Sequence, residues 1–409
     1  MKKLLLVLGV LAAVLLVACG DGGSDTADAG PVTFQLWTQE GESDGGFAFV
    51  EQLAADFMAA NPNITIEVVQ KSTEALREDF QTASLAGEAP TLLWTVNDHA
   101  GPFTAAGIIQ PVDGLFDDDA FVPSVVQDGS TWGVPITSGN HLMLLYNRDF
   151  VSEAPETTDE LVALAQELTT DEVFGLVYNQ GEPFWLAPWI GGFGGAVFES
   201  DGVTPDLDSQ AMVGALQFLA DLKFEYGIVP QESDYGTMDT LFKEGRAAMI
   251  INGDWSIGDY VANENLGAEK LGIAPLPVVS ETGLAAAPYT APKMFMIANG
   301  VEQAQVDAAA AFIEFATSYD NQVRLATELS RIPGLIEAQS DAAVAEDPIL
   351  QAVAAAAVNG VPQRSQLEMR ANWDAMRPEL NAVLAGTVAA DEAAANMQEA
   401  AEAGIRALQ

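Results

Sequence analysis

The positions of apolar and polar residues along the chain predict strands that alternate with helices. Residues 32–37 read as a strand, and the apolar residues of 47–60 recur at the spacing of one helical face. The turn sequence Asn-Pro-Asn at 61–63 then ends that helix, and 64–69 returns as a second strand. The folded part of the chain therefore begins with a strand–helix–strand unit.

The same alternation continues through the middle of the chain. Residues 91–96 form another apolar, strand-like run, and helical spacing recurs at 158–168, 209–226 and 304–317. Strands that alternate with helices favour α/β lobes with largely parallel sheets flanked by helices. From about residue 341 onward alanine is abundant and no strand-like run occurs, so we expect this last part to be helical.

The N-terminal segment has a different character. Two lysines follow Met1, and an apolar run broken only by Gly9 extends to Ala18. This is typical of a secretory signal peptide, and the run is short for a membrane span, which needs about 20 apolar residues. A transmembrane anchor is the alternative, but a polar stretch follows at once. We expect export, with residues 1–19 as signal peptide and 20–31 as a flexible tether.

The signal ends in Leu-Val-Ala-Cys-Gly, which is similar to the lipobox of bacterial lipoproteins, whose cysteine is diacylated and becomes the mature N-terminus. Cys19 is the single cysteine of the chain, so no intramolecular disulfide can form and lipidation best explains the thiol. The sequence thus predicts a protein held by lipid on Cys19 at a membrane, either at the cell surface or in the periplasm.

Length and charge narrow the choice of partners. The chain has 409 residues, of which 49% are hydrophobic, and this suffices for two lobes. Asp and Glu number 59 against 16 Lys and Arg, for a formal net charge of −43. Such a surface repels nucleic acid and anionic lipid headgroups, so we expect neither as a partner.

The sequence gives little support for a catalytic or metal-binding site. His99 and His141 are far apart and lie outside any His-x-x-x-His or Cys-x-x-Cys spacing, so we expect neither a metal nor a cofactor. There is no Gly-x-Ser-x-Gly sequence, and the glycine run at 191–195 lacks the Gly-Lys-Ser/Thr ending of a phosphate loop. The chain is therefore expected to bind rather than to catalyse.

Tryptophan lies beside turn-forming and polar residues in several places. Sugar rings present an apolar face and a rim of hydroxyls, so a sugar site needs flat aromatic side chains beside carboxylates, amides and guanidinium groups. Each tryptophan taken alone is also consistent with a core residue near a loop. The segments are Trp94–His99, Glu182–Trp185, Asn252–Trp255 and Asn372–Asp374.

A longer set of segments occurs in the order of a known family: Ala89–Trp94, Gly133–Pro135, Leu145–Asp149, Asn179–Phe184, Ala248–Trp255, Pro275–Pro277 and Trp373–Arg377. With them the chain resembles the extracellular solute-binding proteins of carbohydrate ABC transporters, and among these the maltose/maltodextrin-binding proteins. Tyr-Asn-Arg-Asp and Asn-Gly-Asp-Trp are broad markers of the family. Glu-Pro-Phe and Trp-x-x-x-Arg are narrower and point to α-linked glucose chains.

The resemblance implies a type II periplasmic-binding-protein fold, with two α/β lobes, a ligand cleft between them and a helical C-terminal region. We expect residues 32–139 and 289–336 in the N-terminal lobe, and 140–288 and 337–409 in the C-terminal lobe. In the family, lobe closure signals occupancy to the membrane permease, which is a hinge motion of a recognised kind. We therefore expect a monomeric component of an ABC importer that binds maltose or maltodextrin and delivers it unchanged.

The resemblance also implies an aromatic part of the site. Carried over by motif, Trp94, Trp255 and Trp373 are platforms for glucose rings. Phe184 stacks where the family commonly has tyrosine, so the phenolic hydrogen bond of that tyrosine is lost.

The polar part implied by the resemblance comes from both lobes. Asp98 would hydrogen-bond sugar hydroxyls from the first lobe and Glu182 from the second. Arg377 lies four residues after Trp373, so on a helix the two side chains share a face. The segment after Trp94 carries one extra residue compared with the family, so Asn97, Asp98 and His99 all remain candidates for the sugar contact.

One further contact is implied after the first strand, where the family has an acidic residue paired with lysine. This chain has Glu40, Glu42 and Asp44 there and no nearby lysine, and we assign the contact to Asp44. Asn140 stands where an acid is common. The aromatic platform is thus better retained than the polar rim.

Two alternatives stay open. One is another cargo, such as trehalose, another oligosaccharide or a polyol. The other is a glycoside hydrolase, which needs two carboxylates roughly 5 to 9.5 Å apart across the scissile bond. The resemblance places Asp98 and Glu182 in opposing lobes as hydrogen-bonding residues, which favours a binding protein.

Overall fold

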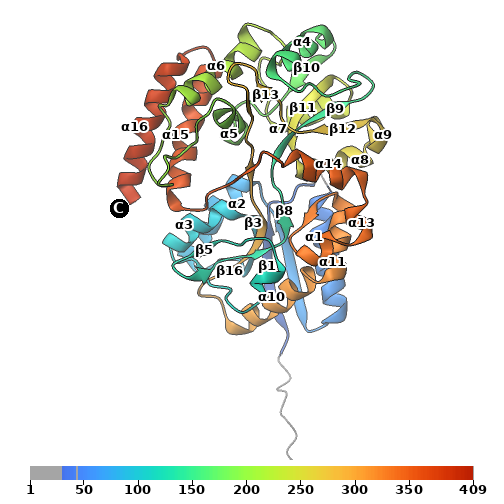
Figure 1. Cartoon of the computed structure of the whole chain (residues 1–409). Coiled ribbons are helices and arrows are strands. Elements are labelled where there is room, and N and C mark those ends of the chain that lie inside the picture. The colour runs from blue at the N-terminus through green and yellow to red at the C-terminus, as the bar shows by residue number, and fades with distance from the viewer. Residues whose placement is uncertain (1–29, 43–44, 409) are drawn as a thin grey trace, which may run out of the picture.

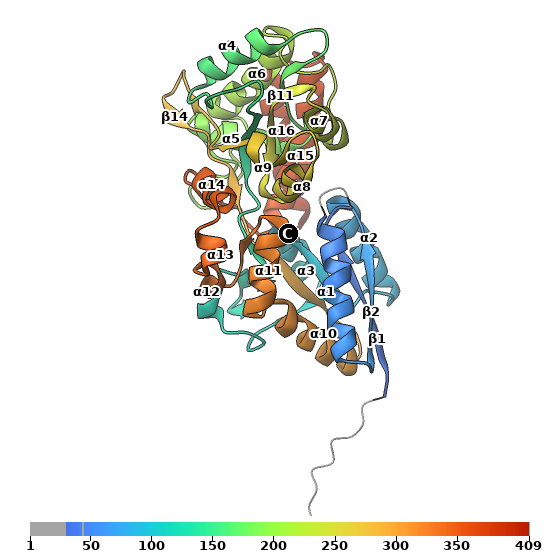
Figure 2. The same ribbon diagram turned by 90° about the vertical axis from the view of Figure 1, so that its right-hand side faces the viewer.

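The computed structural model describes residues 30–42 and 45–408, which form two α/β lobes joined by crossing segments (Figures 1 and 2). The predicted signal peptide with Cys19, most of the predicted tether and the predicted contact Asp44 lie outside the described residues. Within the described ranges no helix is both long enough and apolar enough to cross a membrane.

The first lobe is built on a six-stranded mixed sheet. Its strands, in spatial order, are β2 (Ile64–Gln70), β1 (Val32–Thr38), β3 (Leu92–Val96), β16 (Lys293–Ala298) and β4 (Ile109–Gln110), with β7 (Val134–Pro135) also paired to β16. β1 pairs in parallel with β2 and β3, whereas β16 is antiparallel to each of its neighbours. The chain thus leaves this sheet after β7 and returns to it much later as β16.

Helices cover both faces of the first sheet. The apolar residues of α1 (Gly46–Ala60), α10 (Gln303–Ala316) and α11 (Tyr319–Leu329) pack on one face. Those of α2 (Thr73–Ala86) and α3 (Ala100–Ala105) pack on the other. Consequently every side chain of β3 is buried, whichever face it points to.

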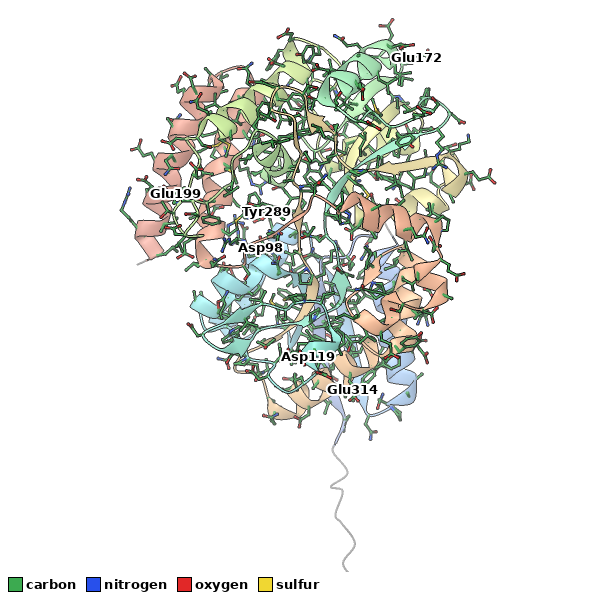
Figure 3. All side chains as sticks on the ribbon, viewed as in Figure 1. Asp98, Asp119, Glu172, Glu199, Tyr289 and Glu314 are labelled. Carbon is green, nitrogen blue, oxygen red and sulfur yellow. The ribbon has the colours of Figure 1, made fainter. Side chains whose placement is uncertain are left out.

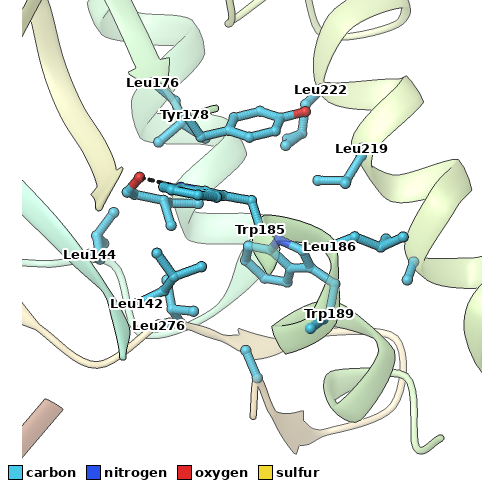
Figure 4. Packing of buried hydrophobic residues seen from close by; sticks show 14 of the residues in the cluster. Leu142, Leu144, Leu176, Tyr178, Trp185, Leu186, Trp189, Leu219, Leu222 and Leu276 are labelled. Carbon is cyan, nitrogen blue, oxygen red and sulfur yellow. Dashed lines mark hydrogen bonds between the residues drawn. The ribbon is translucent and has the colours of Figure 1, made fainter. Parts of the chain in front are cut away.

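The second lobe has a four-stranded sheet in the order β10 (Phe174–Val177), β11 (Ala247–Gly253), β9 (Leu142–Asn147) and β12 (Leu271–Ala274). Its main helices are α4 (Thr158–Leu168), α5 (Pro183–Gly192), α6 (Gln210–Phe224), α7 (Tyr235–Lys243), α15 (Leu367–Leu384) and α16 (Ala390–Leu408). Figure 4 shows two tryptophans of α5, Trp185 and Trp189, packed among leucines of β9, β10 and α6. A continuous apolar core thereby ties α5 to the sheet.

Shorter elements complete the described chain: β5 (Val126–Gln127), β6 (Ser130–Thr131), β8 (Thr137–Ser138), β13 (Val278–Val279), β14 (Leu284–Ala285), β15 (Tyr289–Thr290), β17 (Ile332–Pro333), β18 (Val361–Pro362), α8 (Ile257–Ala262), α9 (Gly267–Lys270), α12 (Ile336–Gln339), α13 (Ala342–Ala345), α14 (Pro348–Ala356) and the 3₁₀ turns η1 (Asn97–His99), η2 (Asp118–Ala120) and η3 (Asp254–Ser256).

The α/β architecture predicted from the sequence is confirmed, with mixed rather than largely parallel sheets. In the second sheet β10 pairs in parallel with β11, whereas β9 is antiparallel to both β11 and β12. The initial unit appears as β1, α1 and β2, and α4 has the bounds expected from its apolar spacing. The expectation that residues 341–409 lack strands is wrong at β18, which pairs in parallel with β15. This two-residue strand forms through a distant partner, so no local pattern marks it.

Short helices lead from the first lobe to the second in the C-terminal part of the chain. α12 and α13 contact α11 of the first lobe. α14 contacts β12 of the second lobe, and its Leu350 also packs in a cluster with Ala326 of α11 and Val344 of α13. The expected lobe boundaries remain a prediction.

Candidate functional site

A cavity of about 460 Å³ lies where the two lobes face each other, and it is lined by residues of both. Figure 3 shows Asp98 and Tyr289 at this junction, while the other labelled acidic residues lie on the outer surface. The first lobe contributes mainly polar and charged side chains to the lining, and the second lobe contributes most of the aromatic rings. The cavity volume is within the usual range for small-molecule sites.

The aromatic side of the cavity is assembled mainly from three elements. Phe184 and Trp185 lie in the first turn of α5, which begins at Pro183 because proline at that position has a helical φ and loses no hydrogen bond. The centroid of the Phe184 ring is 6.2 Å from the ring of Trp255 and 6.4 Å from that of Trp373. Trp255 belongs to η3 at the end of β11, and Trp373 to α15. The structure thus brings together three of the four predicted aromatic contacts.

Hydrogen bonds fix the orientation of the two larger platforms. Nε1 of Trp255 donates to Oη of Tyr235 over 2.9 Å. Nε1 of Trp373 donates to Oδ2 of Asp98 over 3.2 Å, and this bond joins the second lobe to the first. Because neither indole is free to rotate without losing its partner, the apolar faces are held in place.

The structure does not place the fourth predicted platform, Trp94, at the cavity. Trp94 is fully buried and packs edge-to-face on Phe295, with the ring centroids 5.1 Å apart, in the core between the first sheet and helices α1 and α10. It does not line the cavity. A strand covered on both faces has two buried sides, and Trp94 points away from the cleft, so the geometry gives it a structural role.

Glu182 and Arg377 meet at the cavity wall as a bidentate ion pair. Nη2 of Arg377 donates to Oε1 of Glu182 over 3.1 Å, and Nη1 bonds the other carboxylate oxygen. Arg377 and Trp373, spaced one turn apart on α15, both line the cavity, as helical geometry requires. A carboxylate and a guanidinium fixed in this way present oriented acceptors and donors to a polyhydroxyl ligand.

The three adjacent candidates on η1 have different environments. Asp98 and His99 line the cavity, whereas Asn97 is buried and donates from Nδ2 to the carbonyl of Gln363 over 3.1 Å. Burial, with a smaller contribution from the charge of Glu74, raises the pKa of Asp98 to about 6. Burial lowers the pKa of His99 to about 3, so its ring is neutral at pH 7. Its Nδ1 lies 2.8 Å from Oγ1 of Thr95.

A buried charged cluster, missed from the sequence, supports the first-lobe wall. Nζ of Lys293 donates to Glu40 over 2.9 Å, and Arg331 bonds the other oxygen of that carboxylate. Burial alone would raise the pKa of Glu40, but the charges of Arg331 and Lys293 lower it to about 2. Lys293 lines the cavity and lies 253 residues from Glu40, so the sequence near β1 could not reveal the lysine.

Other lining residues were also not selected from the sequence. They include Gln39, Glu74, Asn179, Trp185, Tyr235 and Gln363. Asn140, noted only for its residue type, lines the cavity with a left-handed backbone, and its N–H donates to Oδ2 of Asp254 over 3.1 Å. Among these residues, Trp185 could have been selected from the sequence, because it directly follows the Glu-Pro-Phe segment.

Across residues 30–42 and 45–408, no group of three or more His, Cys, Asp or Glu is arranged to hold a metal ion.

Comparison with known proteins identifies the family. A family model described as a bacterial extracellular solute-binding protein matches residues 52–352. The chain belongs to this family. The type II fold inferred from the sequence is confirmed, and the family consists of solute-binding proteins rather than enzymes.

Individual relatives of this solute-binding protein are more specific. A maltotriose-binding protein of Pyrococcus abyssi is 27% identical over 346 residues, 82% of this chain and 74% of that protein. A maltooligosaccharide ABC transporter solute-binding lipoprotein of Streptococcus pneumoniae is 26% identical, with 94% of this chain and 92% of the relative covered. The resemblance to maltodextrin-binding proteins is thus confirmed.

A solved structure agrees with these relatives. The maltose/maltodextrin-binding domain MalE of Bdellovibrio bacteriovorus bound to maltotriose superposes with a TM-score of 0.87 at 35% identity, over 91% of this chain and all of that one. Its likeness therefore extends through both lobes of the present solute-binding protein.

Proposed function

We propose that this solute-binding protein captures maltodextrin in the interlobe cavity and delivers it, chemically unchanged, to the permease of an ABC importer. The observation that carries the proposal is the convergence of Phe184, Trp255 and Trp373 on one cavity beside Asp98 and the Glu182–Arg377 pair. Stacked rings bind the apolar faces of glucose units, and the polar groups bind their hydroxyls. The maltotriose-binding relatives support this choice of sugar.

The polar groups of the site favour binding over hydrolysis. A glycosidase needs one carboxyl that donates a proton and a second that attacks or activates water. Glu182 is bonded through both oxygens to Arg377, and Asp98 accepts the indole N–H of Trp373. Each carboxyl is therefore committed to positioning a neighbouring side chain.

Export and lipid anchoring complete the proposal. Cys19 would carry the lipid, and residues 20–31 would tether a monomer close to its permease, which raises its effective concentration at the membrane. The pneumococcal relative is named a lipoprotein, in agreement with this anchor. Radiolabelled palmitate incorporated by the wild-type chain, and absent from Cys19→Ala, would support it, and equal labelling of the two would contradict it.

A thermal-shift panel tests the cargo. The purified protein is melted with maltose, maltotriose, trehalose and sorbitol, since a ligand that binds only the native state at 100 times its Kd stabilises by about 2.7 kcal/mol. We expect clear increases in Tm with maltotriose or maltose and none with the other two. A shift with trehalose or sorbitol alone would assign another cargo.

A further inference from the structure

An ion pair beside the cavity links the two lobes directly. Glu74 lies in the first turn of α2, whose apolar residues belong to the core of the first lobe. Arg370 lies on α15, which packs in the core of the second lobe. Nη1 of Arg370 donates to the two carboxylate oxygens of Glu74 over 3.1 and 2.8 Å. These atoms can meet only while the lobes are together.

Each partner is also held by a residue of its own lobe. Arg77, one turn along α2, donates to Glu74 from Nε over 3.3 Å and from Nη2 over 3.1 Å. Asp374, one turn along α15, accepts from Nε of Arg370 over 3.0 Å. The four charges alternate in sign across the lobe boundary. Because both partners are oriented before the lobes meet, little side-chain freedom remains to be lost when the pair forms.

The position of Arg370 on α15 explains why its ion pair with Glu74 matters for lobe closure. Arg370, Trp373 and Arg377 are spaced along one face of the helix, and each contacts the first lobe, with Arg377 3.9 Å from Glu74. Figure 1 shows α15 descending beside α16 toward α3 of the first lobe, against which it packs. In a chain with 59 acidic and 16 basic residues, closing two acidic lobes is opposed by like charge, and these arginines supply the opposite charge.

We propose that Glu74 and Arg370 form an ionic latch that holds the lobes closed over bound sugar and slows its release. This inference rests on the proposed sugar-binding function and extends it to the closing step. Glu74 lines the cavity, but Arg370 does not, so Arg370 acts on the sugar only through closure. A contact made only in the closed state raises apparent affinity by stabilising that state.

The test compares Arg370→Gln with a matched control, Arg406→Gln. Arg406 also pairs with an acidic residue one turn away, Glu402 on α16, and its side chain is 64% exposed. Maltotriose release from each variant is followed by stopped-flow tryptophan fluorescence. We expect release from Arg370→Gln to be about two- to fivefold faster at low salt, the upper part of the range for a partly exposed ion pair, and release from the control to match wild type.

Salt and a conservative variant separate a latch from a general structural defect. Screening weakens a partly exposed ion pair, so the ratio between Arg370→Gln and wild type should approach one in 1 M NaCl, where the Debye length is about 3 Å. Arg370→Lys, which keeps the charge but not the guanidinium geometry, should fall between them. A double-mutant cycle with Glu74→Gln should show coupling between the two positions.

Specific results would overturn the latch. Equal release rates for Arg370→Gln and Arg406→Gln, a ratio that does not change with salt, or additive effects in the cycle would each do so while wild-type binding persists. Failure of the wild-type protein to bind maltotriose would instead contradict the proposed function itself. The two failures are therefore distinguishable in one set of measurements.

Discussion

The two walls of the cavity are built differently. The second-lobe wall is largely aromatic, with rings from α5, η3 and α15. Hydrogen bonds to Tyr235 and Asp98 hold Trp255 and Trp373 in place. The first-lobe wall is polar and rests on the buried cluster of Glu40, Lys293 and Arg331. In the proposed function, sugar rings would stack on the aromatic wall, whereas the polar wall would orient hydroxyls and meet the arginines of α15 when the lobes close. The proposal thus divides affinity and closure between the lobes.

The largest expected effect distinguishes a core tryptophan from a wall tryptophan. Trp94→Ala should lower the free energy of unfolding by about 3–5 kcal/mol, because it leaves a cavity in the first-lobe core. Binding per folded molecule should be unchanged, since Trp94 lies outside the cavity. Urea unfolding and calorimetry of the same samples measure both quantities. A large loss of affinity without loss of stability would instead indicate that Trp94 contacts the sugar.

The buried cluster gives the next largest effect. Glu40→Gln leaves two buried cations without their counter-charge and should cost about 3 kcal/mol of stability at pH 7. The pKa of Glu40 is lowered to about 2, so the stability it contributes is present above its unfolded pKa, about 4.3, and is lost as the pH falls toward 2. The difference between wild type and variant should shrink accordingly. Glu402→Gln on α16 is the control, and a similar cost there would contradict the role of burial.

On the aromatic wall, Trp255→Ala should weaken maltotriose binding by about 2 kcal/mol, as expected for a buried aromatic anchor. Trp255 packs near Phe184 and Trp185 at the cavity, so its removal takes away contact area for a sugar ring. Calorimetry gives the affinity, and the melting temperature of the unliganded variant checks the fold. Unchanged affinity would place the stacking surface elsewhere.

The smallest effect concerns the pH dependence of Asp98. Its pKa is raised to about 6, above the unfolded value of about 3.9, so the folded state binds a proton more tightly and this group favours folding increasingly as the pH falls from 6 to 4. Because Asp98 is only partly buried, we expect wild type to gain about 1–2 kcal/mol relative to Asp98→Asn between pH 7 and 4. A constant difference would show that burial does not perturb this carboxyl.

Local patterns predicted more of the fold than of the site. The apolar spacing of α1 and α4 and the turn after α1 act within a few residues, so their elements could be placed from the sequence. The burial of Trp94 depends on α10, which packs on the same sheet from far along the chain, and the pairing of Lys293 with Glu40 depends on β16 returning to that sheet. The local pattern of apolar and polar residues does not reveal contacts between such distant segments.

The same distinction explains which site residues were found. Phe184 lies at the start of α5, Trp255 just after the end of β11, and Trp373 within α15. All three belong to recognisable motifs, and they converge on the cavity. Arg370 lies outside these motifs, and its partner Glu74 is 296 residues away. Residues that join two lobes become visible only when both lobes are placed.

The most direct test of a cleft that binds and releases maltodextrin is a calorimetric titration of the purified protein with maltotriose, followed by chromatography of the recovered sugar. We predict saturable binding of one maltotriose per chain and recovery of the trisaccharide intact. Absence of saturable binding, or steady release of shorter sugars, would contradict the proposed function.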